Sequence, residues 1–267
     1  MKLHCQQIGS DNKTIIILHG LYGSGDNWMS IAKKFSDNYT VLLPDMRNHG
    51  KSPHSDIHNY HVMVEDIREL MAERNIVKAH IIGHSMGGKT AMFFTVKYPE
   101  LVDKLVIVDI APSETTKLIE ESSHALFHLN LINSLLNIEI DKASNLKEAK
   151  DLLANEIDDK RLIGFLIKNK TKSNGKYHWQ MNLDAFLHNL PEIMEGLNID
   201  DFIDRKINTS TLFLKGSNSD YIDNKDYKHI DFIFTNSKIK VISGAGHWMH
   251  AEQPAAIEES ILSFFNE

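Results

Sequence analysis

Ser85 is the residue whose surroundings most clearly indicate chemistry. It is the centre of Gly83-His-Ser-Met-Gly87, which follows the apolar run 79–82 and precedes a helical pattern that stops before Pro99. This layout is that of a nucleophile elbow, a strained turn between a strand and a helix. Glycines flank the serine because a Cβ there would crowd the neighbouring strand or helix. The turn predicts an accessible hydroxyl above a helix N-terminus, where developing negative charge is favoured.

A base and an acid are expected at two other strand ends. His247 lies in Gly244-Ala-Gly-His-Trp248 after the last apolar run, and Asp109 directly follows the run 105–108. A serine hydroxyl is too weakly acidic to attack unaided, so an imidazole must take its proton and a carboxylate must orient that imidazole. Ser85, Asp109 and His247 therefore form a candidate triad, in the chain order typical of α/β-hydrolases.

The acid has an alternative. Many α/β-hydrolases place it after the strand that corresponds here to 211–214, where the sequence reads Gly216-Ser-Asn-Ser-Asp-Tyr-Ile222. The usual spacing of a glycine, two residues and then Asp lands on Ser219, and Asp220 comes one position late. Asp109 ends its strand cleanly, so we favour it and keep Asp220 as the alternative.

The oxyanion of an acyl-transfer reaction needs two backbone N–H donors. Met86, directly after the nucleophile, is placed to supply one, and Leu21, after His19-Gly20, the other. We expect His19 to brace this glycine-rich loop.

Two further polar clusters compete for attention. His54, His58 and His61 follow an i, i+4, i+7 pattern, but Pro53 and the surrounding polar residues indicate a loop, so no metal site is predicted. Asp45 and Arg47 are expected to form a structural ion pair that braces the same loop.

Short apolar runs alternate with amphipathic helical patterns in residues 1–112 and again in residues 209–267. This rhythm predicts an α/β fold with a mostly parallel, doubly wound sheet. Residues 2–8 are expected to form an edge strand, and Asp26 or Asn27 to cap a first helix. The predicted buried strands are 14–18, 40–43, 79–82, 105–108, 211–214 and 239–242.

The rhythm breaks from about residue 113 to residue 208, where helical patterns dominate and only 177–181 looks extended. We interpret this stretch as a helical cap or lid inserted over the carboxyl edge of the sheet. The domain prediction is therefore a core of residues 1–112 and 209–267 with a cap at 113–208. Core packing between cap helices is the expected role of most of its leucines, and some are expected to line an acyl pocket.

Composition and charge exclude several functions. The 267 residues carry a formal charge of −7, which disfavours nucleic acid or an anionic membrane as the main partner. The single cysteine, Cys5, cannot form an internal disulfide and suits a reducing compartment. No apolar run is long enough to span a membrane, and the first ten residues lack a signal-peptide core. We therefore expect a cytoplasmic protein. No inference about the oligomeric state is made from the sequence.

Three segments carry a closer resemblance. Asp45-Met-Arg-Asn-His-Gly-Lys-Ser-Pro-His54, Gly83-His-Ser-Met-Gly-Gly-Lys-Thr-Ala-Met92 and Asp109-Ile-Ala-Pro112 resemble the esterase subgroup of the α/β-hydrolase superfamily that is typified by bacterial YbfF. In that subgroup the acid follows the sixth strand, which corresponds to Asp109 here. The resemblance implies hydrolysis of carboxylic esters or acyl thioesters, of the acyl-CoA type among them, with no cofactor.

The leading hypothesis is a serine esterase or thioesterase acting on a small acyl substrate. A C–C bond hydrolase or a cofactor-free peroxidase shares the same elbow and stays an alternative. A non-catalytic protein that binds a small ligand is a third reading, although such a protein needs neither an intact nucleophile nor a base. Haloalkane dehalogenation is disfavoured, because it requires an aspartate at the position of Ser85.

Overall fold

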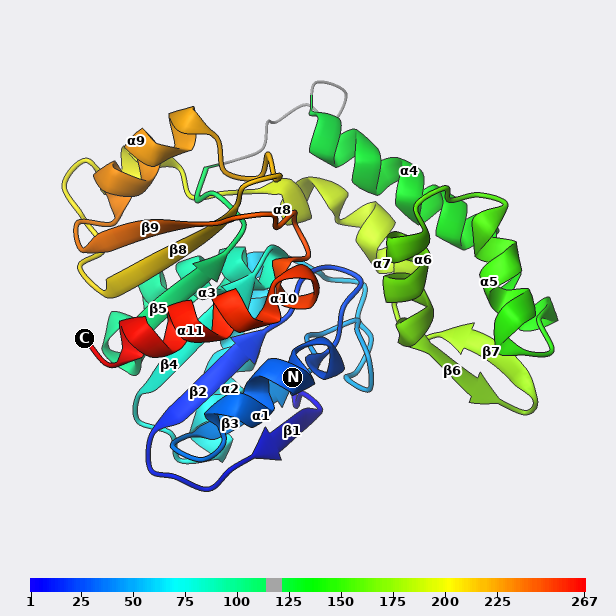
Figure 1. Cartoon of the computed structure of the whole chain (residues 1–267), viewed down its shortest axis with the longest axis horizontal. Coiled ribbons are helices and arrows are strands. Elements are labelled where there is room, and N and C mark those ends of the chain that lie inside the picture. The colour runs from blue at the N-terminus through cyan, green and yellow to red at the C-terminus, as the bar shows by residue number, and fades with distance from the viewer. Residues whose placement is uncertain (114–121) are drawn as a thin grey trace.

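A computed structural model describes residues 1–113 and 122–267. Its centre is a seven-stranded sheet with the strand order β1-β3-β2-β4-β5-β8-β9 (Figure 1). β1 pairs with β3 antiparallel, and the other neighbouring pairs are parallel. The strands are β1 (Cys5–Ile8), β2 (Thr14–Leu18), β3 (Thr40–Pro44), β4 (Ala79–His84), β5 (Val102–Val108), β8 (Ser210–Gly216) and β9 (Ser237–Ile242).

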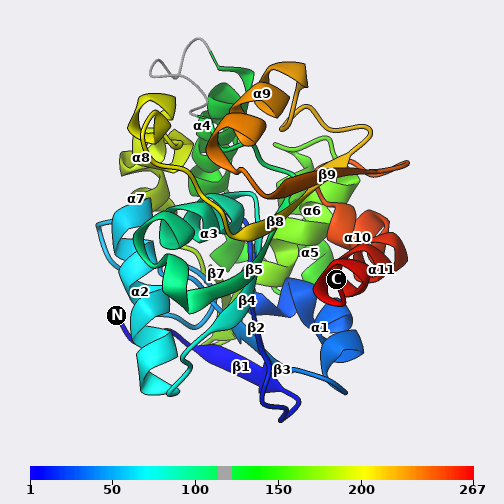
Figure 2. The ribbon, with the colours of Figure 1, turned by 90° about the vertical axis from the view of Figure 1, so that its left-hand side faces the viewer.

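Helices cover both faces of this sheet (Figure 2). One face carries α2 (Tyr60–Glu73), α3 (Met86–Lys97) and α9 (Asn224–Ile233), and the other carries α1 (Met29–Phe35) and α11 (Pro254–Phe265). Because alternate strand residues point to opposite faces, Ile16 and Leu18 of β2 belong to the first core while Ile15 and Ile17 belong to the second. The buried strands therefore lack polar alternation, as parallel strands covered on both faces do. The predicted mostly parallel, doubly wound α/β sheet is confirmed.

Between β5 and β8 the chain leaves the sheet and forms a separate group of helices beside it (Figure 1). Residues 114–121 of the predicted insertion lie outside the described residues. The helical elements are α4 (Ser123–Asn137), η4 (Ile140–Lys142), α5 (Leu146–Ala154), α6 (Lys160–Leu166), η5 (Ile167–Asn169), α7 (Leu183–His188), α8 (Leu190–Met194) and η6 (Ile199–Phe202).

This group also contains a hairpin that the sequence analysis only partly anticipated. β6 (Lys170–Ser173) pairs antiparallel with β7 (Lys176–Trp179), so the extended stretch begins and ends earlier than the predicted 177–181. Asn174 and Gly175 join the strands with φ values of 50° and 80°. An Asn-Gly pair with two positive φ angles forms the tight turn that suits a two-stranded ribbon.

The start of the first helix also differs from the prediction. Ser24, rather than Asp26 or Asn27, caps the short 3-10 helix η1 (Gly25–Trp28) that leads into α1. Asn27 takes part from the third position of this helix, where its side chain accepts a hydrogen bond from the Ser24 N–H. The edge strand, in contrast, forms as predicted, although it is confined to Cys5–Ile8.

None of the helices in the described part of the chain is long and apolar enough to cross a membrane.

Candidate active site

Ser85 occupies the turn between β4 and α3 in a strained conformation, with φ 52° and ψ −118°. A non-glycine residue rarely adopts such backbone angles, and they persist only where the surroundings enforce them. The two flanking glycines have no room for a side chain. A Cβ on Gly83 would overlap the carbonyl of Gly87, and a Cβ on Gly87 would overlap that of Leu18. The local geometry is therefore that of the elbow expected from the sequence.

His247 and Asp109 lie together although 138 residues separate them in the chain. The Nδ1 atom of His247 is 2.8 Å from Oδ2 of Asp109. A carboxylate accepts hydrogen bonds, so Nδ1 is the donor in this contact, and in the neutral imidazole Nε2 then has the lone pair. Asp109 is fully buried, and its other oxygen, Oδ1, accepts a hydrogen bond of 2.9 Å from the Gly216 N–H. The Ser219 hydroxyl also donates to Oδ2.

Ser85 and His247 line one cavity of about 310 Å³ at the carboxyl ends of β2, β4, β8 and β9. Its walls come from the sheet loops and from the inserted helices α4 and α6. Most of its accessible wall is apolar. The inserted helices contribute Ser123, His124, Phe127, His128, Leu131 and Leu162.

Asp220, the alternative acid, is placed differently. Its carboxylate accepts a hydrogen bond of 3.0 Å from Nε2 of His124, and its side chain is 80% exposed. The hydrogen bond from His124 holds the pKa of the Asp220 carboxyl below its usual value. Asp220 therefore lies at the rim of the cavity and contacts a histidine of α4, whereas the carboxylate that contacts the His247 ring is that of Asp109.

Leu21 and Met86 flank the nucleophile in a smaller hollow that they share with Ser85. The loop that carries Leu21 approaches the elbow closely, because a Cβ on Gly20 would lie 3.2 Å from Cβ of Ser85. His19 holds this loop. Its Nδ1 donates to the Gly20 carbonyl over 2.9 Å, and its Nε2 accepts a hydrogen bond of 2.9 Å from the Met46 N–H. Both ring nitrogens of His19 thus make hydrogen bonds that brace this loop, as the sequence predicts.

Comparison with known proteins agrees with this geometry. The family model of the alpha/beta hydrolase fold matches residues 13–254. The chain belongs to the α/β-hydrolase family. A marine microorganism esterase of known structure superposes with a TM-score of 0.93 and 42% identity, covering 98% of this chain and 99% of the other. The fold class predicted from the sequence is therefore confirmed.

Two curated relatives of this α/β-hydrolase match over most of their length. The sn-1-specific diacylglycerol lipase ABHD11 of Danio rerio is 38% identical over 95% of this chain and 78% of its own. Esterase YbfF of Escherichia coli is 30% identical over 96% of this chain and 94% of its own. The resemblance to the YbfF-type esterases is confirmed.

Behind His247, this hydrolase has a buried cluster of aromatic rings. Nε2 of His84 lies 2.9 Å from the carbonyl oxygen of His247, which can only accept, so His84 donates to the loop of the expected base. The His84 ring also packs 5.0 Å from that of His250, which stacks on Trp28. Burial lowers the pKa of both His84 and His250, and the pKa of His250 falls to about 3. The cluster is therefore neutral at physiological pH.

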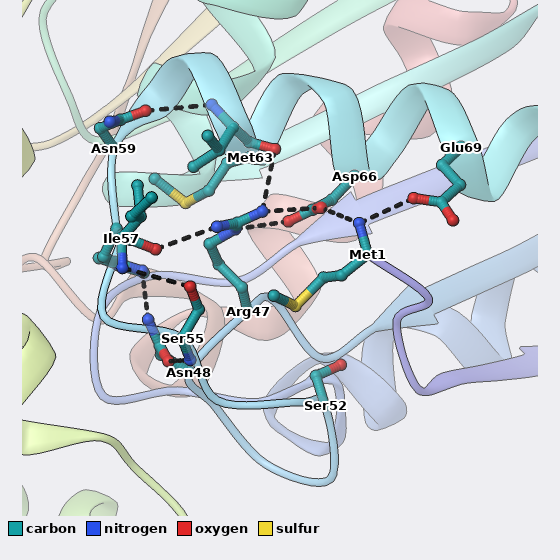
Figure 3. A network of polar contacts seen from close by, with 12 residues as sticks. Met1, Arg47, Asn48, Ser52, Ser55, Ile57, Asn59, Met63, Asp66 and Glu69 are labelled. Atoms are coloured by element: carbon teal, nitrogen blue, oxygen red, sulfur yellow. Dashed lines mark hydrogen bonds and ion pairs between the residues drawn. The ribbon is translucent and has the colours of Figure 1, made fainter.

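The expected Asp45–Arg47 ion pair is wrong. The carboxylate of Asp45 accepts hydrogen bonds of 2.9 Å from the backbone N–H groups of Gly25 and Lys51. Arg47 instead pairs with Asp66 of α2, through contacts of 2.6 Å from Nε and 2.9 Å from Nη2 (Figure 3).

The Arg47–Asp66 pair forms part of a larger network (Figure 3). Nη1 of Arg47 donates to the Ile57 carbonyl over 3.0 Å, and the Met1 amino group contacts Asp66 at 2.5 Å and Glu69 at 2.7 Å. Both side chains of the central pair are buried. The network attaches the loop between β3 and α2 to the side of α2, so the loop is braced by a different partner from the one expected.

His54, His58 and His61 do not converge, and His61 already belongs to α2. His58 is buried and packs against His49 and Phe186, whereas His61 packs edge-on to Phe93. Within residues 1–113 and 122–267, no group of three or more histidine, cysteine, aspartate or glutamate side chains is arranged to hold a metal ion.

Two residues of the site were not anticipated from the sequence. Ser219 occupies the position where the usual spacing places an acid, and its hydroxyl binds the Asp109 carboxylate. Tyr221 stacks on the His247 ring, with centroids 3.7 Å apart and planes inclined by 15°. The position of Ser219 in the loop after 211–214 was a signal for the first, whereas no local pattern indicates the second.

Proposed function

We propose that this protein is a serine hydrolase that cleaves carboxylic esters or acyl thioesters through an acyl intermediate on Ser85. The observation that carries the proposal is the contact of His247 with buried Asp109 at the wall of the cavity that Ser85 also lines. The esterases and lipases among the relatives support the ester hydrolase activity.

The first half of the proposed reaction forms the acyl-enzyme. Nε2 of His247 takes the proton of the Ser85 hydroxyl as the oxygen attacks the acyl carbonyl, and Asp109 stabilises the resulting imidazolium. The N–H groups of Leu21 and Met86 hold the oxyanion of the tetrahedral intermediate. His247 then gives its proton to the leaving alkoxide or thiolate as the bond from the acyl carbon to that group breaks.

The second half releases the acid. A water molecule loses its proton to His247 and attacks the acyl-Ser85 carbonyl. Collapse of the second tetrahedral intermediate breaks the bond to Ser85, which recovers its proton from His247. Apart from the acyl substrate and the attacking water, the groups that these steps use are side chains and backbone N–H groups of the chain itself.

The segment 113–208 serves, in this proposal, as a cap over a core made of residues 1–112 and 209–267. Its contribution to the cavity wall supports this division, because Phe127, Leu131 and Leu162 come from it. A cavity of about 310 Å³ with a mostly apolar wall suits an acyl group of short to medium length. The relatives named sn-1-specific diacylglycerol lipases make a glyceride ester a further substrate to test.

A substrate panel tests the proposal. We expect p-nitrophenyl esters from acetate to octanoate, acyl-CoA thioesters and a diacylglycerol to include at least one substrate whose turnover is lost in Ser85→Ala. A fluorophosphonate probe is expected to label the wild-type protein and not this variant. Absence of Ser85-dependent turnover and labelling would contradict the proposal, and turnover of a diketone alone would favour C–C bond hydrolysis.

A further inference from the structure

Tyr221 lies in the loop that follows β8, and its ring is parallel to the ring of His247. The centroids are 3.7 Å apart and the planes differ by 15°. This is the closest aromatic contact that His247 makes among the described residues, since the rings of His84 and Trp248 are 4.8 Å and 6.2 Å away. Such a face-to-face approach is unusual for neutral rings, which prefer offset or edge-on arrangements. The geometry is favourable when one of the rings becomes a cation.

A second imidazole contacts the other face of the tyrosine. The ring of His124, from α4, has its centroid 4.1 Å from that of Tyr221 at an inclination of 35°. Two rings cannot occupy one face of a phenol at these separations, so His124 and His247 lie on opposite faces. The hydrogen bond from His124 to Asp220 fixes the outer imidazole. Tyr221 is therefore enclosed between the inserted helices and the candidate base.

The backbone of Tyr221 is also fixed. Its N–H donates to the Ser219 hydroxyl over 3.3 Å, and its carbonyl accepts from the Ala111 N–H over 3.1 Å. Because Ser219 itself donates to Asp109, one short loop holds both the carboxylate and the stacked ring. Burial and the nearby carboxylates of Asp220 and Asp109 raise the pKa of the Tyr221 phenol, so the ring presents a neutral, electron-rich face.

The stack supplies something that Asp109 cannot. The hydrogen bond from Nδ1 to Asp109 sets the direction of one ring atom, but small rotations about the Cα–Cβ and Cβ–Cγ bonds can still tilt the plane of the imidazole. Such a tilt would change the direction of Nε2 relative to the cavity that Ser85 and His247 both line. A flat ring against one face of the imidazole restricts this rotation, and its negative face also attracts the positive charge that develops when Nε2 takes a proton.

We propose that Tyr221 is a positioning residue for His247, which holds the plane of the imidazole and stabilises its protonated form through the face of the phenol ring. This inference rests on the proposed function. The hydroxyl of Tyr221 has no part in it, and the predicted effect therefore belongs to the ring alone.

The test compares two substitutions at this position. Tyr221→Phe keeps the ring face, while Tyr221→Leu keeps an apolar cover over the imidazole and removes the face. Leucine is preferable to alanine, because alanine would admit water and water itself stabilises an imidazolium. Steady-state kinetics with p-nitrophenyl acetate between pH 5 and 9 are measured for both variants, the wild type, Ser85→Ala and His247→Ala. The small acetyl group limits any effect through the cavity wall.

We expect Tyr221→Phe to retain kcat within about threefold and the wild-type pH profile. Tyr221→Leu is expected to lose about tenfold in kcat at the plateau, with little change in KM. The acid limb of its kcat/KM profile is expected to move to lower pH by roughly half a unit to one unit, because the protonated imidazole is less favoured. A purely structural role would lower the amount of active enzyme without moving this limb.

The outcomes separate this inference from the proposed function. Full activity in Ser85→Ala and His247→Ala would overturn the proposed function itself. Loss of activity in those two variants, with a wild-type rate and pH profile in Tyr221→Leu, would overturn only the role of Tyr221. An equal loss in Tyr221→Phe would also overturn it, because the effect would then belong to the hydroxyl. Thermal unfolding identifies a misfolded variant, and Tyr221→Met then replaces Tyr221→Leu.

Discussion

The Nδ1 atom of His247 lies 2.8 Å from a carboxylate oxygen of Asp109, whose side chain has no exposed surface. β5 and β8 are neighbours in the sheet, so the residues that follow them meet at the same edge. The loop after β8 surrounds the Asp109 carboxylate with the Gly216 N–H and the Ser219 hydroxyl. The carboxylate therefore keeps a fixed direction. It contacts Nδ1 of His247, and the other ring nitrogen, Nε2, takes no part in this contact.

Exchanging each candidate acid for its amide distinguishes them. We expect Asp109→Asn to lower kcat by roughly 10³- to 10⁴-fold, because an amide cannot stabilise the imidazolium and favours the wrong tautomer. Asp220→Asn is expected to change kcat by less than about fivefold, since its exposed pair with His124 is worth little. Hydrolysis rates of the two purified variants are the measurement, and a crippled Asp220→Asn beside a normal Asp109→Asn would reverse the assignment.

His84 is expected to stabilise the loop that carries His247, without taking part in the reaction itself. In His84→Phe the ring remains but its donor to the His247 carbonyl is lost, which leaves that carbonyl without this bond. We expect a loss of about 1–3 kcal/mol in the free energy of unfolding and a lower kcat. Urea unfolding and initial rates measure the two effects.

His250→Phe is the matched control for His84→Phe. It removes a buried histidine from the same cluster, keeps a ring against Trp28 and does not alter the bond to the His247 carbonyl. Equal losses of kcat in the two variants would show that ring packing, rather than this hydrogen bond, supports the loop.

Gly20 has no Cβ, and this allows the candidate oxyanion loop to lie close to the elbow. An alanine there would place its Cβ 2.9 Å from Nδ1 of His84 and 3.2 Å from Cβ of Ser85. We expect Gly20→Ala to reduce kcat by at least about tenfold, since displacements below 1 Å at a reacting centre are costly. Gly164→Ala in α6 is the control, because its Cβ meets nothing within 4 Å and helix propensity favours alanine. A normal rate in Gly20→Ala would place the oxyanion donors elsewhere.

The buried pair of Arg47 and Asp66 predicts a large stability effect. Asp66→Asn leaves a buried guanidinium without its charged partner, so we expect a loss of about 3–5 kcal/mol in the free energy of unfolding. The double variant Arg47→Met, Asp66→Leu removes both charges and is expected to recover most of that loss. Denaturant unfolding of the wild type and the two variants is the check, and a double variant no more stable than Asp66→Asn would show that the unpaired guanidinium is not the cause of the loss.

Buried histidines predict that the protein is less stable in acid. Burial lowers the pKa of His58, His128 and His250 to about 3 each, from an ordinary value of 6.5. The unfolded chain therefore binds protons between about pH 6.5 and 3 that the folded protein does not bind, and stability falls as pH decreases through this window. Each histidine contributes up to about 1.4 kcal/mol per pH unit.

Thermal unfolding between pH 7.5 and 4.5 measures this dependence. Replacing the buried ring of His58 by that of phenylalanine should flatten the slope by about one proton. The same substitution at exposed His54 should leave the slope unchanged. A slope unaffected by His58→Phe would mean that this imidazole is protonated in the folded protein.

The sequence by itself was enough to predict the sheet and to indicate two members of the candidate site. Runs such as 14–18 are apolar at every position because parallel strands are covered on both faces, and their alternation with amphipathic helices specifies a doubly wound sheet. Ser85 is equally visible, because a strand, a tight glycine-flanked turn and a helix are local features. His247 follows from the same reasoning, since it stands directly after the last strand.

Only the tertiary structure decided which partners these residues meet. Asp109 and Asp220 both follow neighbouring strands, and the direction of each carboxylate depends on the packing of the loop after β8. Arg47 pairs with Asp66 of α2 and not with Asp45, which is nearer in the sequence. The carboxylate of Asp45 instead accepts hydrogen bonds from the N–H groups of Gly25 and Lys51. Tyr221 reaches His247 by contacts between distant segments, which no sequence period records. Short-range patterns fix backbone elements, whereas the choice among several polar partners is made by packing between segments far apart in the chain.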